Sequence, residues 1–401
     1  MESVATFGEV PDLSDACLVD YLQMAPTADV LEILRDEDPE RAFGAKAQAA
    51  LLRCLRHPVA IAHPPGRPYR ERLLKLAVIA AERDGLELDD GVAEAHAEAL
   101  CEPRTGDQWC HKTFVLDVAP REETTERKQR PVRITVRTHP NLFEGGTGCH
   151  EWAAGFALAE LVASHAERFA NKRVVEIGPG VGVAAIALAK ITRPRGASAL
   201  TLLDRDNETL ANLAANLELN GIPSRILKHK KQDDDDDEGE AGDEDDEDDE
   251  DDEDSSAIPK PRVSLSRLDW HDFDPARLAS LRADVVVAAD VLYDPSDVPA
   301  LLDVAAALLG PREEAAARDE KKKKKTRAEK NEPLALFVSA VRQPATLALF
   351  EEVAAERGFD PVDVTEAFAA TKKKGVGFRR LAKELRAEVR VHALRPPRKT
   401  R

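Results

Sequence analysis

A glycine-rich turn between a short apolar segment and a helix is the feature that most restricts how this chain can fold. Residues 173–177 have the length and composition of a buried strand, and residues 183–191 those of a helix. Gly178, Gly180 and Gly182 lie between them, and Glu176 lies near the end of the strand segment. Glycines in such a turn let the backbone approach a ligand closely, and the exposed helix N-terminus favours a ligand carboxylate. The segment therefore predicts an α/β unit with a ligand site at the turn.

From residue 145 onward, short apolar segments alternate with helical ones, which is typical of a parallel α/β sheet. Further strands are predicted at residues 199–203, 262–268, 284–289 and 334–341. Residues 285–288 are apolar without a break, as a strand buried on both faces requires. Residues 388–394 alternate and predict a final antiparallel edge strand. Helices are expected at residues 151–169, 207–219 and 345–358.

Residues 1–144 have a different pattern. Helical apolar spacing recurs, prolines interrupt it between residues 58 and 68, and two alternating segments, 114–118 and 132–136, then predict a hairpin. The charged residues 121–130 between them predict a mobile loop. We expect a mostly helical N-terminal region that recognises the substrate, followed by an α/β domain over residues 145–396. The predicted helices are residues 13–22, 27–35, 45–56, 69–83 and 89–100.

The net charge of −18 comes from one acidic insert and not from the folded surface. Residues 233–254 contain 19 acidic side chains in 22 positions, and removing those 19 charges changes the net charge to +1. A second insert is basic, with seven Lys and Arg between residues 321 and 330. Neither can bury apolar surface, so we expect disordered inserts at 232–257 and 311–332 without a catalytic role.

Cysteine usage and the N-terminus indicate a cytoplasmic protein. The five cysteines are scattered without a C-x-x-C pair, which fits a reducing compartment and predicts no metal site. The first residues lack the basic and apolar regions of a secretory signal. No uncharged apolar run reaches the ~18 residues needed to cross a bilayer, so no membrane contact is expected.

The same glycine-rich turn could belong to a nicotinamide-dinucleotide site. That fingerprint requires Gly or Ala at its last position, whereas this sequence has the bulky, β-branched Val183 there. Glu176, two residues before the first glycine, suits the methionine end of a methyl donor better than a pyrophosphate. The turn therefore favours a site for S-adenosyl-L-methionine.

Polar and aromatic side chains follow the next two strands. A carboxylate at Asp204 can accept hydrogen bonds from both hydroxyls of a ribose, although Asp204 could instead cap the following helix. At the end of the third strand, Trp270 could stack on adenine and Asp269 could reach its amino group. The alternative for Trp270 is a tryptophan of the core.

Ala289, Asp290 and Tyr293 end the fourth strand, and the reacting centre of a doubly wound sheet lies beyond the strand C-termini. A carboxylate and a phenol there can orient an amine against a methyl-bearing sulfonium. Neither is needed as a nucleophile, because the substrate supplies it. The sequence therefore predicts Asp290 and Tyr293 as catalytic residues, with Ala289 at the donor.

These residues together resemble the Asp-x-x-Tyr protein-lysine methyltransferases, methyltransferase family 16. The resemblance is carried by Glu176 to Gly182, by Asp290-x-x-Tyr293 and by Thr147-Gly148-x-x-x-Trp152. Other segments are similar to the lysine methyltransferases of eukaryotic elongation factor 2 within that family. They are Leu268-Asp269-Trp270, residues 284–293, Val341-Arg342-Gln343-Pro344, Arg56-His57-Pro58-Val59 and His63-Pro64-Pro65 with Tyr69.

The resemblance implies a seven-strand Rossmann-like methyltransferase domain with S-adenosyl-L-methionine as cofactor. It implies that Trp152, Glu176, Gly178, Asp204 and Trp270 surround the donor and that Asp290 and Tyr293 lie at the lysine. The partner it implies is translation elongation factor 2, and we expect a monomer that does not bind nucleic acid directly. Cys149-His150-Glu151 departs from the family pattern, which leaves the role of Glu151 open.

Other functions stay open at this stage. The enzyme could methylate another protein, such as a chaperone or a histone, or the chain could be a donor-binding scaffold without turnover. The role of Asp290 is open as well. A dry channel lowers the pKa of a lysine amine, whereas an ionised carboxylate nearby raises it, so Asp290 could act as a base or could only position the amine.

Overall fold

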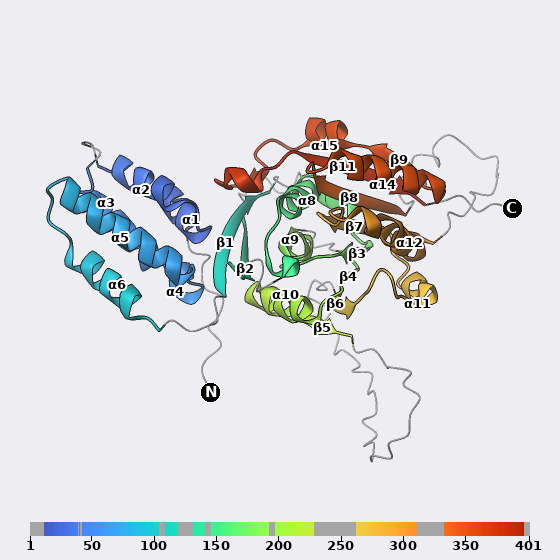
Figure 1. The fold of residues 1–401 in the computed structure, drawn as a ribbon, viewed down its shortest axis with the longest axis horizontal. Coiled ribbons are helices and arrows are strands. Elements are labelled where there is room, and N and C mark those ends of the chain that lie inside the picture. The colour runs from blue at the N-terminus through green and yellow to red at the C-terminus, as the bar shows by residue number, and fades with distance from the viewer. Residues whose placement is uncertain are drawn as a thin grey trace, which may run out of the picture.

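The computed structural model describes residues 12–38, 40, 42–103, 109–118, 131–140, 146–191, 197–227, 262–310 and 333–396. The predictions for the two charged inserts and for the loop 121–130 lie outside these residues. Helices α1 to α6 form one end of the molecule, and a large sheet with helices on both faces forms the other (Figure 1). Within the described ranges, every helix is too short or too polar to cross a lipid bilayer.

The helical end contains the five predicted helices and one that the sequence analysis missed. Asp15 begins α1 by accepting hydrogen bonds from the backbone N–H groups of Cys17 and Leu18. The missed helix, α4 (Pro58–Ala62), is short, and Pro58 lies in its first turn, where a missing N–H leaves no bond unmade. The others are α1 (Ala16–Leu22), α2 (Thr27–Asp36), α3 (Ala45–Leu55), α5 (Arg67–Arg83) and α6 (Asp90–Cys101).

The large sheet has the order β5-β6-β4-β3-β7-β8-β11-β9. All of its pairs are parallel except those of β11, which runs antiparallel to β8 and β9. The seven strands expected of a Rossmann-like methyltransferase domain are present, and β5 adds a short eighth strand at one edge. The bounds are β3 (Arg173–Ile177), β4 (Ala199–Asp204), β5 (Ser224–Ile226), β6 (Arg262–Arg267), β7 (Val285–Ala289), β8 (Leu334–Ala340), β9 (Asp360–Asp363) and β11 (Val389–Arg395).

One strand prediction was wrong in part. The segment 388–394 is antiparallel, as predicted, but β11 is not at the edge, because β9 pairs with its other side. The sequence gives little sign of β9, which has four residues and includes Pro361. A proline is tolerated in an edge strand because its missing N–H faces solvent.

Helices cover both faces of the sheet, which explains the continuous apolar runs in its strands. Val285 and Val287 of β7 pack with α8 and α9, whereas Val286 and Ala288 pack with α12 and α14 on the other face. A strand buried on both sides is apolar at most of its positions. The covering helices are α8 (Ala153–Ser164), α9 (Val183–Ile191), α10 (Asn207–Leu219), α11 (Pro275–Ser280), α12 (Val298–Leu309) and α14 (Pro344–Glu356), with α15 (Thr365–Thr371) packed near β11.

A second sheet lies between the helical end and the large sheet (Figure 1). It pairs the predicted hairpin, β1 (Cys110–Asp117) and β2 (Val132–Thr138), with β10 (Gly377–Phe378) from far along the chain. Phe114 of β1 packs with the core of the large sheet, whereas its neighbour Val115 packs with the helices. The hydrophobic clusters thus divide within β1, and a domain boundary near residue 145 stays a prediction.

Two consecutive arginines after β10 fix the helices to the rest of the chain. Arg380 donates to both carboxylate oxygens of Asp20 at 2.7 and 2.9 Å, and the Asp20 side chain is only 6% exposed. Arg379 donates to Asp117 of β1 and to the carbonyl oxygen of Leu13 at 3.0 Å. These bonds attach α1 to the strands by charged pairs as well as by apolar contact.

We predict that Arg380→Ala lowers the free energy of unfolding by about 1–2 kcal/mol, because it leaves the buried carboxylate of Asp20 without its partner. Urea denaturation measures the change. Arg53→Ala is the matched control, since its pair with Glu37 is 3.8 Å long and exposed, and it should change stability by less than about 0.5 kcal/mol. Equal effects of the two substitutions would show that the Asp20 pair is no stronger than a surface pair.

Candidate active site

A hollow of about 480 Å³ lies at the carboxyl ends of the central strands. Its lining includes every predicted site residue except Glu176 and Gly182. We call it the strand-end hollow. The predicted residues on its wall are Trp152, Gly178, Gly180, Asp204, Asp269, Trp270, Ala289, Asp290 and Tyr293.

The glycine turn is required by the fold as well as by its place on the hollow. Gly178 has φ 65°, and a Cβ there would lie 2.9 Å from Val291 Cγ1. Gly182 has φ 88°, and a Cβ there would lie 2.4 Å from Leu213 Cδ1 of α10. Both positions therefore favour glycine, because another residue would be strained there. At Gly182 the cause is packing against α10, since this residue does not line the hollow.

Asp204 lies at the end of β4 and joins the turn to the next loop. Its carboxylate accepts from the N–H groups of Gly180 at 3.4 Å and of Arg205 at 2.8 Å. The alternative role as a helix cap belongs to Asp206, which accepts from the N–H of Thr209 at 2.8 Å and begins α10. Burial raises the pKa of Asp204. Its carboxylate is thus held at the wall of the hollow without a capping role.

Glu176 lies behind that wall, one residue before the end of β3. It is 2% exposed, and its Oε2 atom has no hydrogen-bond partner among the described residues. Burial, with a smaller contribution from the Asp204 carboxylate, raises the pKa of Glu176 to about 8. The structure thus holds a carboxyl group that keeps its proton at neutral pH under the glycine turn.

The carboxylate of Asp290, which follows β7, links two other elements. Its Oδ2 accepts from the N–H of Ala154 at the start of α8 (3.1 Å), and its Oδ1 accepts from the N–H of Ala340 at the end of β8 (3.0 Å). Asp290 also has φ 55°, in the left-handed region that Asp tolerates better than most residues. The backbone and the two bonds together fix the side chain, which favours a positioning role.

Tyr293 lies at the rim of the same hollow with 54% of its surface exposed. Partial burial, and to a lesser degree the Asp297 carboxylate, raises the pKa of its phenol. The hydroxyl therefore stays protonated at neutral pH and can both donate and accept a hydrogen bond.

Trp152 and Arg342 meet at the same place. The Arg342 guanidinium carbon lies 4.8 Å from the centre of the Trp152 ring, and Nη2 lies 3.4 Å from Asp290 Oδ2. Trp152 Nε1 donates to the carbonyl oxygen of Thr147 at 2.9 Å, which fixes the ring. Sequence analysis noted Arg342 only as part of a motif and missed it as a site residue. Its position two residues after β8 is the signal that could have identified it.

The adenine side predicted from the sequence contains Asp269 and Trp270. Asp269 Oδ2 lies 3.3 Å from Arg205 Nε. The Trp270 ring lines the hollow and also packs against the cluster of α11 and α12, so it is part of the core, and its stacking on adenine stays a prediction. Beside it, His271 Nε2 lies 2.8 Å from Asp297 Oδ1 at the end of a short 3-10 helix (Pro295–Asp297), a contact that was not predicted from the sequence.

The role of Glu151, left open by the sequence, is structural. Its side chain is 7% exposed, pairs with the Lys112 ammonium on β1 and accepts from Thr138 Oγ1 at 2.9 Å. The loop that leads into Trp152 is therefore bound to the hairpin.

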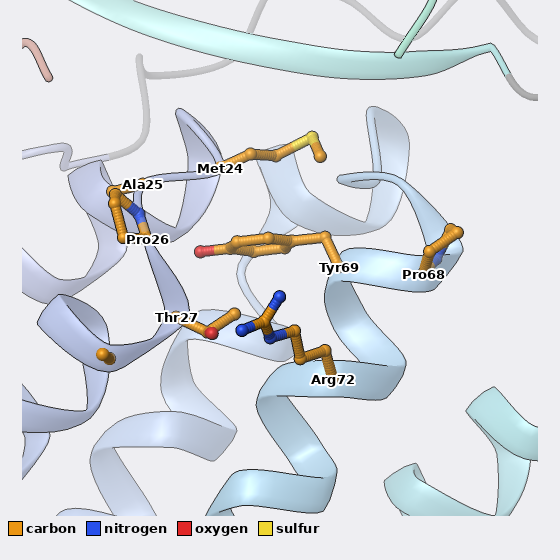
Figure 2. A pocket seen from close by; sticks show the side chains of 8 residues that line it. Met24, Ala25, Pro26, Thr27, Pro68, Tyr69 and Arg72 are labelled. Carbon is orange, nitrogen blue, oxygen red and sulfur yellow. The ribbon is translucent and has the colours of Figure 1, made fainter. Parts of the chain in front are cut away.

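A hollow of about 430 Å³ lies in the helical part, between the start of α2 and the start of α5. Figure 2 shows the Tyr69 ring between the side chains of Met24 and Arg72. Arg72 is the one charged residue that lines this hollow, and none of the predicted site residues lies in its lining. This hollow lacks the carboxylates that the predicted chemistry needs.

We predict that Glu176→Gln changes how stability depends on pH. Because the carboxyl keeps its proton in the folded chain up to about pH 8, unfolding releases a proton above pH ~4.5, and this group makes stability fall by about 1.4 kcal/mol per pH unit through that window. The substitution removes this slope. Urea denaturation between pH 5 and pH 7.5 measures it.

Glu352→Gln, at an exposed position of α14, is the control for that measurement and should follow the wild-type pH dependence. Parallel curves for wild type and Glu176→Gln would contradict a raised pKa at Glu176.

Comparison with known proteins places this geometry in a family. A family model described as "Methyltransferase domain" matches residues 150–364. The chain is 28% identical over 301 residues to "Protein-lysine N-methyltransferase EEF2KMT" of Bos taurus, covering 75% of this chain and 74% of that protein. It is 26% identical over 298 residues to "Protein-lysine N-methyltransferase EFM3" of Chaetomium thermophilum, covering 70% and 74%.

Among solved structures, the O-methyltransferase from Bacillus cereus in complex with SAH is 14% identical, with a TM-score of 0.32, over 63% of this chain and 85% of that chain. The family model alone spans more than half of the chain, including the glycine turn and the segment from Asp290 to Tyr293. The chain therefore belongs to the methyltransferase-domain family, and the class of enzyme expected from its motifs, an S-adenosylmethionine-dependent methyltransferase, is confirmed.

Proposed function

We propose that this chain transfers a methyl group from S-adenosyl-L-methionine to the ε-amino group of a lysine in eukaryotic translation elongation factor 2. The observation that carries the proposal is the strand-end hollow, where the residues expected for the donor and those expected for an amine acceptor line one cavity. Relatives with the printed name EEF2KMT support the lysine and the factor.

The residues of the hollow fit the donor. When bound, S-adenosyl-L-methionine supplies an electrophilic methyl group on a sulfonium. Asp204 presents a half-buried carboxylate suited to ribose hydroxyls, and Trp270 presents a ring suited to adenine. The backbone at Gly178 and Gly180 allows close approach. Glu176, with one oxygen unpartnered, suits the methionine end from behind the turn.

Charge supports a cationic acceptor. The lining contains five carboxylates against the two guanidinium groups of Arg205 and Arg342. An excess of negative charge attracts ammonium groups and disfavours the phosphates of a nucleic acid. The carboxylates are Asp204, Asp206, Asp269, Asp290 and Asp297.

The residues at the acceptor side orient the amine. At pH 7 a free lysine must lose its proton at a cost of roughly 4–5 kcal/mol before its nitrogen can act as a nucleophile. Two backbone N–H groups already share the Asp290 carboxylate, so Asp290 positions the amine rather than carries its proton away. The Tyr293 hydroxyl at the rim can accept from the amine, which aligns the nitrogen with the methyl group.

The helical end supports recognition of a folded substrate. The similarity to the Bos taurus protein spans 301 residues, longer than the chain from residue 150 onward, so it includes part of the N-terminal region. We propose that α1 to α6 dock the factor. Deleting them is a poor test, because Val115 would lose its packing, and Arg379 and Arg380 would lose their partners Leu13 and Asp20.

The donor role of Asp204 makes a binding prediction. Asp204→Asn should weaken the binding of S-adenosylhomocysteine by about 10-fold, because a hydrogen bond to a charged acceptor contributes about 1.5–3 kcal/mol. Isothermal titration measures the affinity. Asp272→Asn, an exposed residue outside the lining, is the control and should bind like wild type. If all three proteins bound S-adenosylhomocysteine with equal affinity, the donor-binding role of Asp204 would be wrong.

The proposed reaction is tested with purified elongation factor 2, S-adenosyl-L-methionine and mass spectrometry of the lysines. Tyr293→Phe keeps the exposed ring and removes the hydroxyl, so it should lower kcat by about 10-fold or more and leave S-adenosylhomocysteine affinity within about twofold. If the wild-type enzyme bound the donor and methylated another protein but not elongation factor 2, the proposed substrate would be wrong. Full activity of Tyr293→Phe would contradict the role of the hydroxyl.

A further inference from the structure

Arg342 occupies an unusual place among the charged residues of the strand-end hollow. It follows β8, and its guanidinium lies over the Trp152 ring at 4.8 Å while Nη2 reaches Asp290 Oδ2 at 3.4 Å. An aromatic face and a carboxylate that meet at one point form a binding site for an organic cation. A substrate ammonium would be recognised by the same two groups.

The two partners of Arg342 are firmly held. Asp290 is bound by the backbone of α8 and β8, and the Trp152 ring by its bond to Thr147. Both would keep their positions if the guanidinium left. The cation-binding site is therefore a property of the fold rather than of Arg342.

Arg342 itself is loosely held. Its side chain is 47% exposed, and its 3.4 Å contact with Asp290 is longer than the 2.7–2.9 Å of a strong charged bond. Arg380, by contrast, donates twice to Asp20 at 2.7 and 2.9 Å. A long side chain with one long bond and one stacking contact can move to solvent at small cost.

We propose that Arg342 is a place-holder for the substrate lysine, whose ε-ammonium displaces the guanidinium from Trp152 and Asp290 as the acceptor enters. This inference rests on the proposed function, because it takes the acceptor to be an amine. The displacement selects the acceptor: an alkylammonium replaces the charge that leaves, whereas a hydroxyl acceptor would leave Asp290 without a cation. Arg342 thus contributes to specificity for amines without taking part in methyl transfer.

The test measures binding of n-butylammonium, which has the end of a lysine side chain, to the full-length protein with S-adenosylhomocysteine present. Because a competing group reduces apparent affinity by the fraction of time it occupies the site, Arg342→Ala and Arg342→Gln should bind the amine about threefold tighter or more than wild type. The affinity for neutral n-butanol should be the same in the variants as in wild type. NMR titration follows both ligands, and unchanged affinity for S-adenosylhomocysteine shows that the variants are folded.

Arg205→Ala is the matched control, since it removes one positive charge from the same hollow beside Asp269. It should give a clearly smaller gain. An equal gain would mean that only the general field had changed and would overturn the proposal. So would unchanged or weaker amine binding in both Arg342 variants, or no amine binding by any of the proteins.

The amine titration and the methylation assay can fail separately. If the factor is not methylated but the Arg342 variants bind the amine more tightly, the proposed substrate is wrong and the place-holder stands. If the factor is methylated and the Arg342 variants bind the amine no more tightly than wild type, the proposed function stands and Arg342 has only a structural role in the site.

Discussion

The carboxylate of Asp290 joins the elements that form one side of the strand-end hollow. It lies directly after β7 and binds the first turn of α8 and the end of β8, two elements that no local sequence would bring together. Its left-handed backbone turns the chain so that both bonds can form. Trp152, Arg342 and Tyr293 all owe their places to the elements that this one side chain joins.

The same region is connected to the N-terminal half by an unbroken series of contacts. Glu151, next to Trp152, binds Lys112 and Thr138 of the hairpin, and β1 packs against both the helices and the large sheet. Arg379 and Arg380 then bind β1 and α1. A surface on the helices therefore has a fixed orientation relative to the strand-end hollow, which is what docking of a folded substrate requires.

The sequence predicted the central strands and the glycine turn well, because strands buried on both faces and positions that tolerate only glycine leave strong local patterns. It could not predict β9, β10 or α4, which are too short to show a period. The positions of Glu176 and Gly182 behind the wall of the hollow could not be predicted either, because they depend on tertiary packing. The same motif would have the same sequence if both residues faced the hollow. Arg342 was missed because its partners, Trp152 and Asp290, are distant in sequence.

Several unfavourable features concentrate at the strand ends. Glu176 is buried with an unpartnered oxygen, Asp204 lies half-buried close enough to raise its pKa, and Asp290 has positive φ. Each lowers stability, and a core chosen for stability alone would replace the buried carboxyl of Glu176 with an apolar side chain. The two hydrophobic clusters on the faces of the sheet offset that cost. The proposed function accounts for acidic side chains at such a position, because a sulfonium donor and an ammonium acceptor both carry positive charge.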